Sequence, residues 1–174
     1  MKVLVTGTST GIGRGIAEKF LAEGHTVIGL DVAESTIAHE NYAHYIADVA
    51  CPEQLPAVEG VEILINNAGV QDSGRDIDVN LRGTIYCTEK YGIQPNIKSI
   101  VMTASVSAHN GAEFPEYCAS KGGVLAYTKN VALRVAKYGA TCNSISAGGV
   151  ITELNAHILE NPALWDQVMA ETLL

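Results

Sequence analysis

The stretch VLVTGTSTGIG, residues 3–13, joins an apolar run to a glycine-rich turn and to the start of a helical pattern. Glycines let the backbone turn sharply and approach a bound phosphate, and a helix N-terminus offers free N–H groups and partial positive charge. The spacing G-x-x-x-G-x-G between a strand and a helix therefore predicts a dinucleotide-binding turn, with a purely structural turn as the alternative. The expected contacts are Gly7, Ser9, Thr10, Gly11, Ile12 and Gly13.

Apolar runs alternate with helical patterns along the rest of the chain. Strands are expected at 3–6, 26–30, 43–47, 61–65, 99–104 and 141–146. Helices are expected at 12–23, 78–90 and 115–137 and, as one or two segments, at 152–174, and the sequence allows a short helix at 52–58. The fold class expected from this alternation is α/β: a single domain, residues 1–174, with a three-layer Rossmann-type doubly wound parallel sheet in the order 3-2-1-4-5-6.

Composition and charge limit the class of protein. The net charge of −8 argues against binding to nucleic acid or to an anionic membrane, both of which attract basic proteins. No apolar run approaches the ~18 residues of a membrane span, and the N-terminus lacks the form of a signal peptide, so a cytoplasmic protein is expected. The four cysteines are scattered and the five histidines show no ligand spacing, so reduced thiols and no metal site are expected.

Two aspartates follow predicted strands at the edge of the sheet where the dinucleotide would lie. Asp31 can accept hydrogen bonds from the adenosine ribose hydroxyls and would repel a 2′-phosphate, which favours NAD over NADP. Arg14 is the nearby cation that would oppose this preference. Asp48 is a candidate for the adenine amino group or an ordinary turn former. The alternative for Asp31 is an aspartate that simply ends its strand.

Tyr117 and Lys121, in the segment YCASK, fall on one face of a predicted helix because residues four apart are neighbours. An ammonium held close to a phenol favours the phenolate and lowers the pKa of the phenol. Such a tyrosine can act as an acid or a base near neutral pH. Taken alone, Y-x-x-x-K is a weak signal, because most such pairs are solvated helix positions.

The segment Asn66–Gly69, NNAG, ends the fourth predicted strand, where it forms either part of the site or an ordinary turn. Taken together, residues 6–13, 66–69 and 117–121 resemble the cofactor turn, the N-N-A-G element and the Y-x-x-x-K motif of the short-chain dehydrogenase/reductase family. The resemblance extends over roughly residues 2–152, with its motifs in the family's order.

The resemblance implies four catalytic roles. Tyr117 would exchange the substrate proton, and Lys121 would lower its pKa and bind the nicotinamide ribose. Ser105 would hydrogen-bond the substrate oxygen, with Ser107 as its competitor, and Asn80 would hold a water in a proton relay. The implied cofactor contacts beyond the turn are Asp31, Asp48, Val49, Asn67, Ala68, Gly69, Tyr117, Lys121, Gly148, Val150 and Thr152.

The sequence departs from the family pattern at three places. The Pro-Gly after the sixth strand is Ala147-Gly148 here, which loosens that turn. Only eleven residues lead from Gly69 to Asn80, so the usual helical excursion becomes a loop, with a mobile candidate at 71–76, that reshapes the substrate cleft. The C-terminal part is shortened, because the family's further helix and seventh strand are not present before Leu174.

The resemblance implies an NAD(H)-dependent oxidoreductase that interconverts a secondary alcohol and a ketone by hydride transfer. Hydroxysteroids, sugars and 3-oxoacyl thioesters are all candidate substrates. A non-catalytic dinucleotide-binding sensor or scaffold is the alternative class, and an epimerase or dehydratase of the extended family is a third. The helices at 78–90 and 115–137 pair with their copies in the family, which implies a homodimer or homotetramer.

The region 152–165, with the loop after Gly69, is expected to form the substrate lid. Its apolar side chains would line a pocket or, equally well, pack on a core face. They are Leu154, Ile158, Leu159, Leu164 and Trp165.

Overall fold

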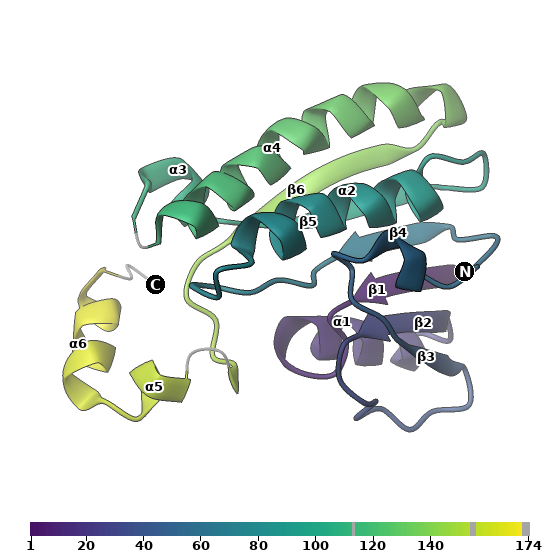
Figure 1. Cartoon of the computed structure of the whole chain (residues 1–174). Helices are drawn as coiled ribbons and strands as arrows, with labels where there is room; N and C mark the ends of the chain where they lie inside the picture. Colours follow the sequence, from purple (N-terminus) through teal and green to yellow (C-terminus); the bar gives the residue numbers. More distant parts are fainter. Residues whose placement is uncertain (113, 154–155, 172–174) are drawn as a thin grey trace.

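The computed structural model describes residues 1–112, 114–153 and 156–171. Six parallel strands form one sheet in the order β3-β2-β1-β4-β5-β6, which confirms the predicted topology (Figure 1). The strands are β1 (Lys2–Thr6), β2 (Thr26–Asp31), β3 (Tyr42–Ile46), β4 (Ile63–Asn66), β5 (Ser99–Ser105) and β6 (Thr141–Ala147).

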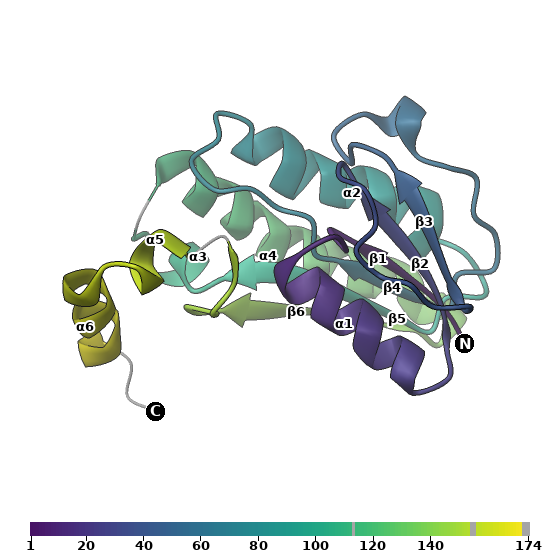
Figure 2. The same cartoon turned by 90° about the horizontal axis from the view of Figure 1, so that it is seen from below.

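Helices cover both faces of the sheet, as Figures 1 and 2 show. One face carries α4 (Pro115–Val135) and a continuous helical segment with wide π-type turns at both ends, η2 (Ile77–Gly83), α2 (Thr84–Cys87) and η3 (Thr88–Gly92). The opposite face carries α1 (Gly11–Ala22). The shorter elements are η1 (Pro52–Gln54), α3 (Ser107–Asn110), η4 (Ala136–Tyr138), α5 (Ala156–Leu159) and α6 (Pro162–Glu171).

The central strands are apolar on both sides because the sheet is covered on both sides. Along β1, Leu4 belongs to the large core beneath α2 and α4, whereas Val3 and Val5 belong to a smaller core beneath α1. All three side chains are fully buried. Each such side chain contributes roughly 1.5–3 kcal/mol through removal of apolar surface from water, so the two cores hold the strand ends in fixed positions.

The short helix that the sequence allows at 52–58 is limited to the single 3₁₀ turn η1. Leu55 has an extended backbone with ψ of 122°, since the residue before a proline avoids the helical region. Pro56 therefore ends the turn, and the connection from β3 to β4 contains no α-helix. The other predicted elements differ from the observed ones mainly at their ends, as where α4 stops at Val135 and η4 takes over.

The terminal region forms the two helices α5 and α6 beyond the end of the sheet (Figure 1). Pro162 is the first residue of α6, and the Asn161 side chain accepts a hydrogen bond of 3.1 Å from the N–H of Ala163. Leu164 is exposed and Trp165 is half-buried. Leu154 lies outside the described residues.

Candidate active site

The carboxyl ends of the parallel strands meet at one edge of the sheet. The chain leaves β1 towards β2 on one side and β4 lies on the other, so the strand order reverses at β1. In open α/β sheets a ligand binds in the crevice at this switch point. Gly7, Asn67 and Ser105 stand at the ends of β1, β4 and β5, at this crevice.

The cofactor turn is closed tightly against the end of β4. The Thr6 hydroxyl accepts hydrogen bonds from the N–H groups of Asn67 (3.0 Å) and Ala68 (2.9 Å). The Asn67 amide in turn donates to the Thr6 carbonyl at 3.1 Å. A Cβ on Gly13 would lie 2.0 Å from the Gly7 carbonyl oxygen, so only glycine lets α1 begin this close to the turn.

Asp31 fixes the turn to the end of β2. Its carboxylate accepts hydrogen bonds from the N–H groups of Ser9 (2.9 Å) and Ala33 (3.0 Å), one on each oxygen. Each carboxylate oxygen can accept a second bond, so capacity for a ribose hydroxyl remains. Arg14 forms an ion pair of 2.8 Å with Glu18 on the same helix, which partly neutralises the cation that would favour a 2′-phosphate.

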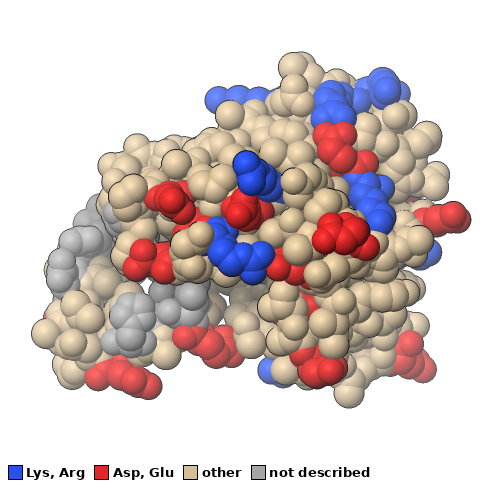
Figure 3. Space-filling model, viewed as in Figure 1, with Lys and Arg blue, Asp and Glu red and all other residues tan. Residues whose placement is uncertain are grey.

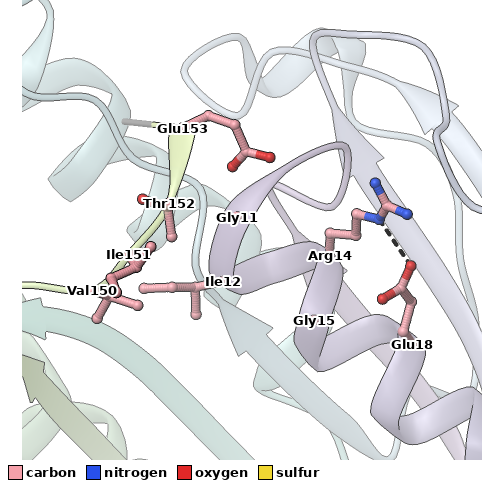
Figure 4. Close-up of a pocket in the computed structure, with 9 residues that line it drawn as sticks. All are labelled: Gly11, Ile12, Arg14, Gly15, Glu18, Val150, Ile151, Thr152 and Glu153. Carbon is pink, nitrogen blue, oxygen red and sulfur yellow. Dashed lines mark hydrogen bonds and ion pairs between the residues drawn. The ribbon is translucent and has the colours of Figure 1, made fainter. Parts of the chain in front are cut away.

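The N-terminal turn of α1 borders a pocket of about 470 Å³ (Figure 4). The predicted contacts Gly11, Ile12, Val150 and Thr152 are among the residues that line it. The helix end and the loop after β6 thus meet here, where N–H groups and the helix dipole attract an anion. The other lining residues are Arg14, Gly15, Glu18, Ile151 and Glu153, and Gly148 lies exposed in the same loop.

Asp48 and Val49 follow β3 but differ in surroundings. The Asp48 carboxylate forms an ion pair of 2.7 Å with Arg75. The Val49 side chain is buried in the large core and packs against Gly83. Only its main chain is therefore left to serve a ligand.

Lys121 is a buried cation beside the carboxyl end of β5. Its Nζ atom lies 5.7 Å from the ring centroid of Tyr117 and donates a hydrogen bond of 2.9 Å to the Thr103 carbonyl. The side chain is only 5% exposed. Burial lowers the pKa of Lys121 to about 8, and the charge of Asp76 opposes part of this lowering. The ammonium and the phenol therefore lie on one side of α4, beside the end of β5.

The Asn80 side chain ties the loop after β4 to α4. Its Oδ1 atom accepts from Val70 N–H (2.8 Å), and its Nδ2 atom donates to the Val70 carbonyl (2.9 Å) and to Ser120 Oγ (3.0 Å). A Cβ on Gly69 would lie 3.1 Å from Asn80 Oδ1 and 3.3 Å from Lys121 Nζ. Asn80 and Lys121 therefore lie next to each other. Gly69 leaves room for both because it has no side chain.

Ser105 and Ser107 lie side by side at the end of β5. The Ser105 hydroxyl donates to Ser107 Oγ at 3.2 Å, and the Ser107 N–H lies at 3.2 Å from Ser105 Oγ. Both serines are buried. His109 on α3 is hydrogen-bonded to Ser146 on β6 at 2.8 Å, which ties this short helix to the sheet edge.

Among the described residues, no group of three or more His, Cys, Asp or Glu side chains could hold a metal ion. The four cysteines are free, and burial raises the pKa of Cys142 to about 11. Within the same described ranges, no helix is both long and apolar enough to cross a membrane.

Sequence reasoning missed two contributors to the site. Thr6 supplies the hydroxyl that closes the cofactor turn, but a threonine at the end of a strand carries no distinctive signal. Arg75 reaches Asp48 across 27 residues of sequence, and only the three-dimensional fold brings them together.

Comparison with known proteins identifies the class that this fold and site define. The sequence profile of short chain dehydrogenases matches residues 1–163. The 2-(R)-hydroxypropyl-CoM dehydrogenase of Xanthobacter autotrophicus is 30% identical in an alignment that covers 96% of this chain and 81% of that protein. The chain therefore belongs to the short-chain dehydrogenase/reductase family.

Two solved structures extend this comparison. The 3-oxoacyl-[acyl-carrier protein] reductase from Brucella melitensis, in complex with NAD, is 27% identical with a TM-score of 0.81, covering 97% of this chain and 79% of that chain. A putative 2-deoxy-D-gluconate 3-dehydrogenase from Agrobacterium tumefaciens, with bound NADP, is 25% identical with a TM-score of 0.87 and the same 97% and 79% coverage. The relatives are oxidoreductases, and both nicotinamide cofactors occur among them.

Proposed function

We propose that this protein is an NAD(H)-dependent oxidoreductase that interconverts a secondary alcohol and a ketone. The observation that carries the proposal is the buried ammonium of Lys121, 5.7 Å from the centre of the Tyr117 ring and hydrogen-bonded to the strand that ends at Ser105. Burial of an ammonium group costs free energy, so a lysine in the interior without a salt bridge to the described residues points to a functional role. Its position beside a phenol supports an acid/base role for the pair.

The nicotinamide, when bound, supplies the hydride chemistry. During reduction Tyr117 donates its hydroxyl proton to the substrate oxygen, and during oxidation the phenolate takes that proton back. Lys121 stabilises the phenolate, and Ser105 donates a hydrogen bond to the oxygen on which negative charge develops. The Asn80 carbonyl, which accepts one hydrogen bond from Thr84, keeps a lone pair for the relay water.

The preference for NAD rests on charge at the end of β2. Asp31 would repel a 2′-phosphate, and the nearby Arg14 is engaged with Glu18. The tight contact of Gly13 with Gly7 leaves backbone N–H groups, and no side chain, to approach the pyrophosphate. The residues present therefore fit a dinucleotide without an additional phosphate.

The assembly that we propose is a homodimer or homotetramer that uses the outer surface of α2 and α4. Arg134 on α4 donates to both carboxylate oxygens of Glu89 on η3, one of them at 2.7 Å, so these helices present one rigid surface. Leu133 is exposed on α4. Acidic and basic side chains are interspersed over the face in Figure 3, without a continuous basic patch among its described residues. A strict monomer by light scattering at micromolar concentration would contradict this assembly.

The test of the function is an absorbance assay that follows NADH with a panel of secondary alcohols and ketones. Tyr117→Phe should keep NADH binding and lower turnover by at least about 10²-fold, because only the transferable proton is removed. Retained turnover in this variant would remove Tyr117 from its role. A wild-type protein that binds NADH but turns over no member of the panel would favour the non-catalytic sensor.

A further inference from the structure

The short loop after β4 is directed towards the end of β3. Residues 71–76 form this loop, and the side chain of Asp76 holds it together. Its carboxylate, 1% exposed, accepts hydrogen bonds from Asp72 N–H (3.0 Å), Ser73 N–H (2.9 Å) and the Ser73 hydroxyl (3.0 Å). These three hydrogen bonds to one buried carboxylate fix the loop. Arg75, the residue before Asp76, extends from the loop towards the end of β3.

Arg75 reaches the carboxylate of Asp48, which stands just past the end of β3. Arg75 Nη2 donates to Asp48 Oδ2 at 2.7 Å, and the N–H of Ala50 donates to Oδ1 at 2.9 Å. One bond to each oxygen fixes the plane of the carboxylate, and each oxygen can still accept another donor. The Asp48 side chain is 18% exposed and the Arg75 side chain 52% exposed, so the guanidinium forms the outer layer.

The position of this pair relates it to the dinucleotide crevice. The N–H of Ala47, next to Asp48, donates to the carbonyl of Asp31 at 2.8 Å, which places the two aspartates on adjacent strand ends. Asp31 in turn binds the cofactor turn at Ser9. Burial raises the pKa of Asp48, but the hydrogen bonds from Arg75 and Ala50 outweigh it and lower the pKa overall, so the carboxylate stays ionised as an acceptor.

We propose that Arg75 is a positioning residue for the cofactor: it holds the Asp48 carboxylate in the orientation that accepts a hydrogen bond from the exocyclic amino group of adenine. This inference rests on the proposed function, because it requires a dinucleotide in the crevice. An ordinary turn would need only the Asp48–Ala50 bond. A turn alone would not require the ion pair with Arg75, which comes from a loop that Asp76 holds in place. In this proposal the ion pair fixes the acceptor that distinguishes adenine from other bases.

The experiment compares binding of two reduced cofactors, NADH and its hypoxanthine analogue, in which a carbonyl oxygen replaces the adenine amino group. Binding is measured by fluorescence of the reduced nicotinamide, independently of any substrate. The wild-type protein should bind NADH about tenfold or more tightly than the analogue, because a hydrogen bond to a charged acceptor is lost and two oxygens face each other. Arg75→Gln should reduce this ratio to about threefold or less, and Arg75→Lys should restore part of it.

The matched control is Arg82→Gln, which removes an exposed arginine that forms an ion pair of 2.6 Å with Asp78, four residues earlier on the same helical segment η2. It should leave the ratio unchanged. An unchanged ratio in Arg75→Gln, or a wild-type ratio near one, would overturn the role of Arg75 while leaving the proposed function intact. A wild-type protein that binds neither cofactor would overturn the proposed function and this inference with it. If Arg75→Gln fails to fold, the Arg75→Lys ratio decides.

Discussion

The ammonium of Lys121 donates a hydrogen bond to the main-chain oxygen of Thr103, and this bond joins the N-terminal third of α4 to β5, the strand that ends at Ser105. The amine lies in the interior of the protein, where its charge costs free energy. We therefore expect the amine to serve the proposed reaction at a cost to the stability of the fold.

Lys121→Met should therefore stabilise the fold and abolish turnover. A lowering of the pKa from 10.5 to about 8 corresponds to roughly 3 kcal/mol, and loss of the bond to Thr103 offsets part of it, so a net gain of about 1–2 kcal/mol is expected at pH 7. The folded pKa lies below the unfolded one, so wild-type stability should rise as the pH increases through this interval, and the advantage of the variant should shrink by pH 10. Urea unfolding at both pH values measures the difference.

Lys129→Met, on the exposed side of the same helix, is the control and should change stability little at either pH. A variant at residue 121 that is less stable than wild type at pH 7 would contradict the assignment of a costly buried charge.

Gly13→Ala should damage both the fold and the cofactor turn. The new Cβ would meet the Gly7 carbonyl oxygen at 2.0 Å, so either α1 or the turn must move. We expect a loss of about 2–3 kcal/mol in the free energy of unfolding and loss of NADH binding by fluorescence titration. Gly15→Ala is matched to it, since a Cβ there meets nothing within 4 Å. It should stabilise the helix by about 0.5–1 kcal/mol, and equal effects of the two substitutions would disprove the steric argument.

Asp31→Ala should shift cofactor preference from NADH towards NADPH. The substitution removes both an acceptor for the ribose hydroxyls and the repulsion of a 2′-phosphate, so the ratio of dissociation constants should change by about tenfold or more. Asp31→Asn removes the negative charge but keeps an oxygen that can accept the hydrogen bond from the Ser9 N–H. This variant therefore distinguishes the effect of the charge from an effect on the shape of the turn. An unchanged ratio in both variants would show that this residue does not read the ribose.

Glu153→Gln should tighten NADH binding. The Glu153 Oε2 atom lies 3.7 Å from the position of a Cβ on Gly11, at the N-terminal turn of α1 where an anionic pyrophosphate is expected (Figure 4). Removal of this negative charge should lower the dissociation constant about threefold, and added salt should diminish the effect. Glu160→Gln makes the same change in net charge in the exposed turn after α5 and should have no such effect. Weaker binding in Glu153→Gln would exclude the repulsion.

The topology was predictable because apolar strands and helical patterns alternate along the chain, and chirality allows few arrangements of such units. The sequence left open whether a short helix follows β3. The extended backbone imposed on Leu55 by Pro56 limits that helix to one turn.

The sequence motifs allowed candidate site residues to be named, and their catalytic and cofactor roles stay predictions. The partners of these residues could not be named, because Arg75 with Asp48 and Asn80 with Ser120 are joined only through the fold. The carboxamide of Asn66 illustrates the same limit. It donates to Thr88 on a distant helix, while its buried oxygen has no hydrogen-bond partner among the described atoms.

The segment between β4 and Asn80 is so short that neighbouring residues in it would act on both ends of a bound dinucleotide. Arg75 holds the Asp48 carboxylate, which would face the base in the proposed complex, and its neighbour Asp76 favours the protonated form of the Lys121 amine, which would lie beside the nicotinamide. An insertion in this segment would consequently alter nucleobase selection and proton supply together.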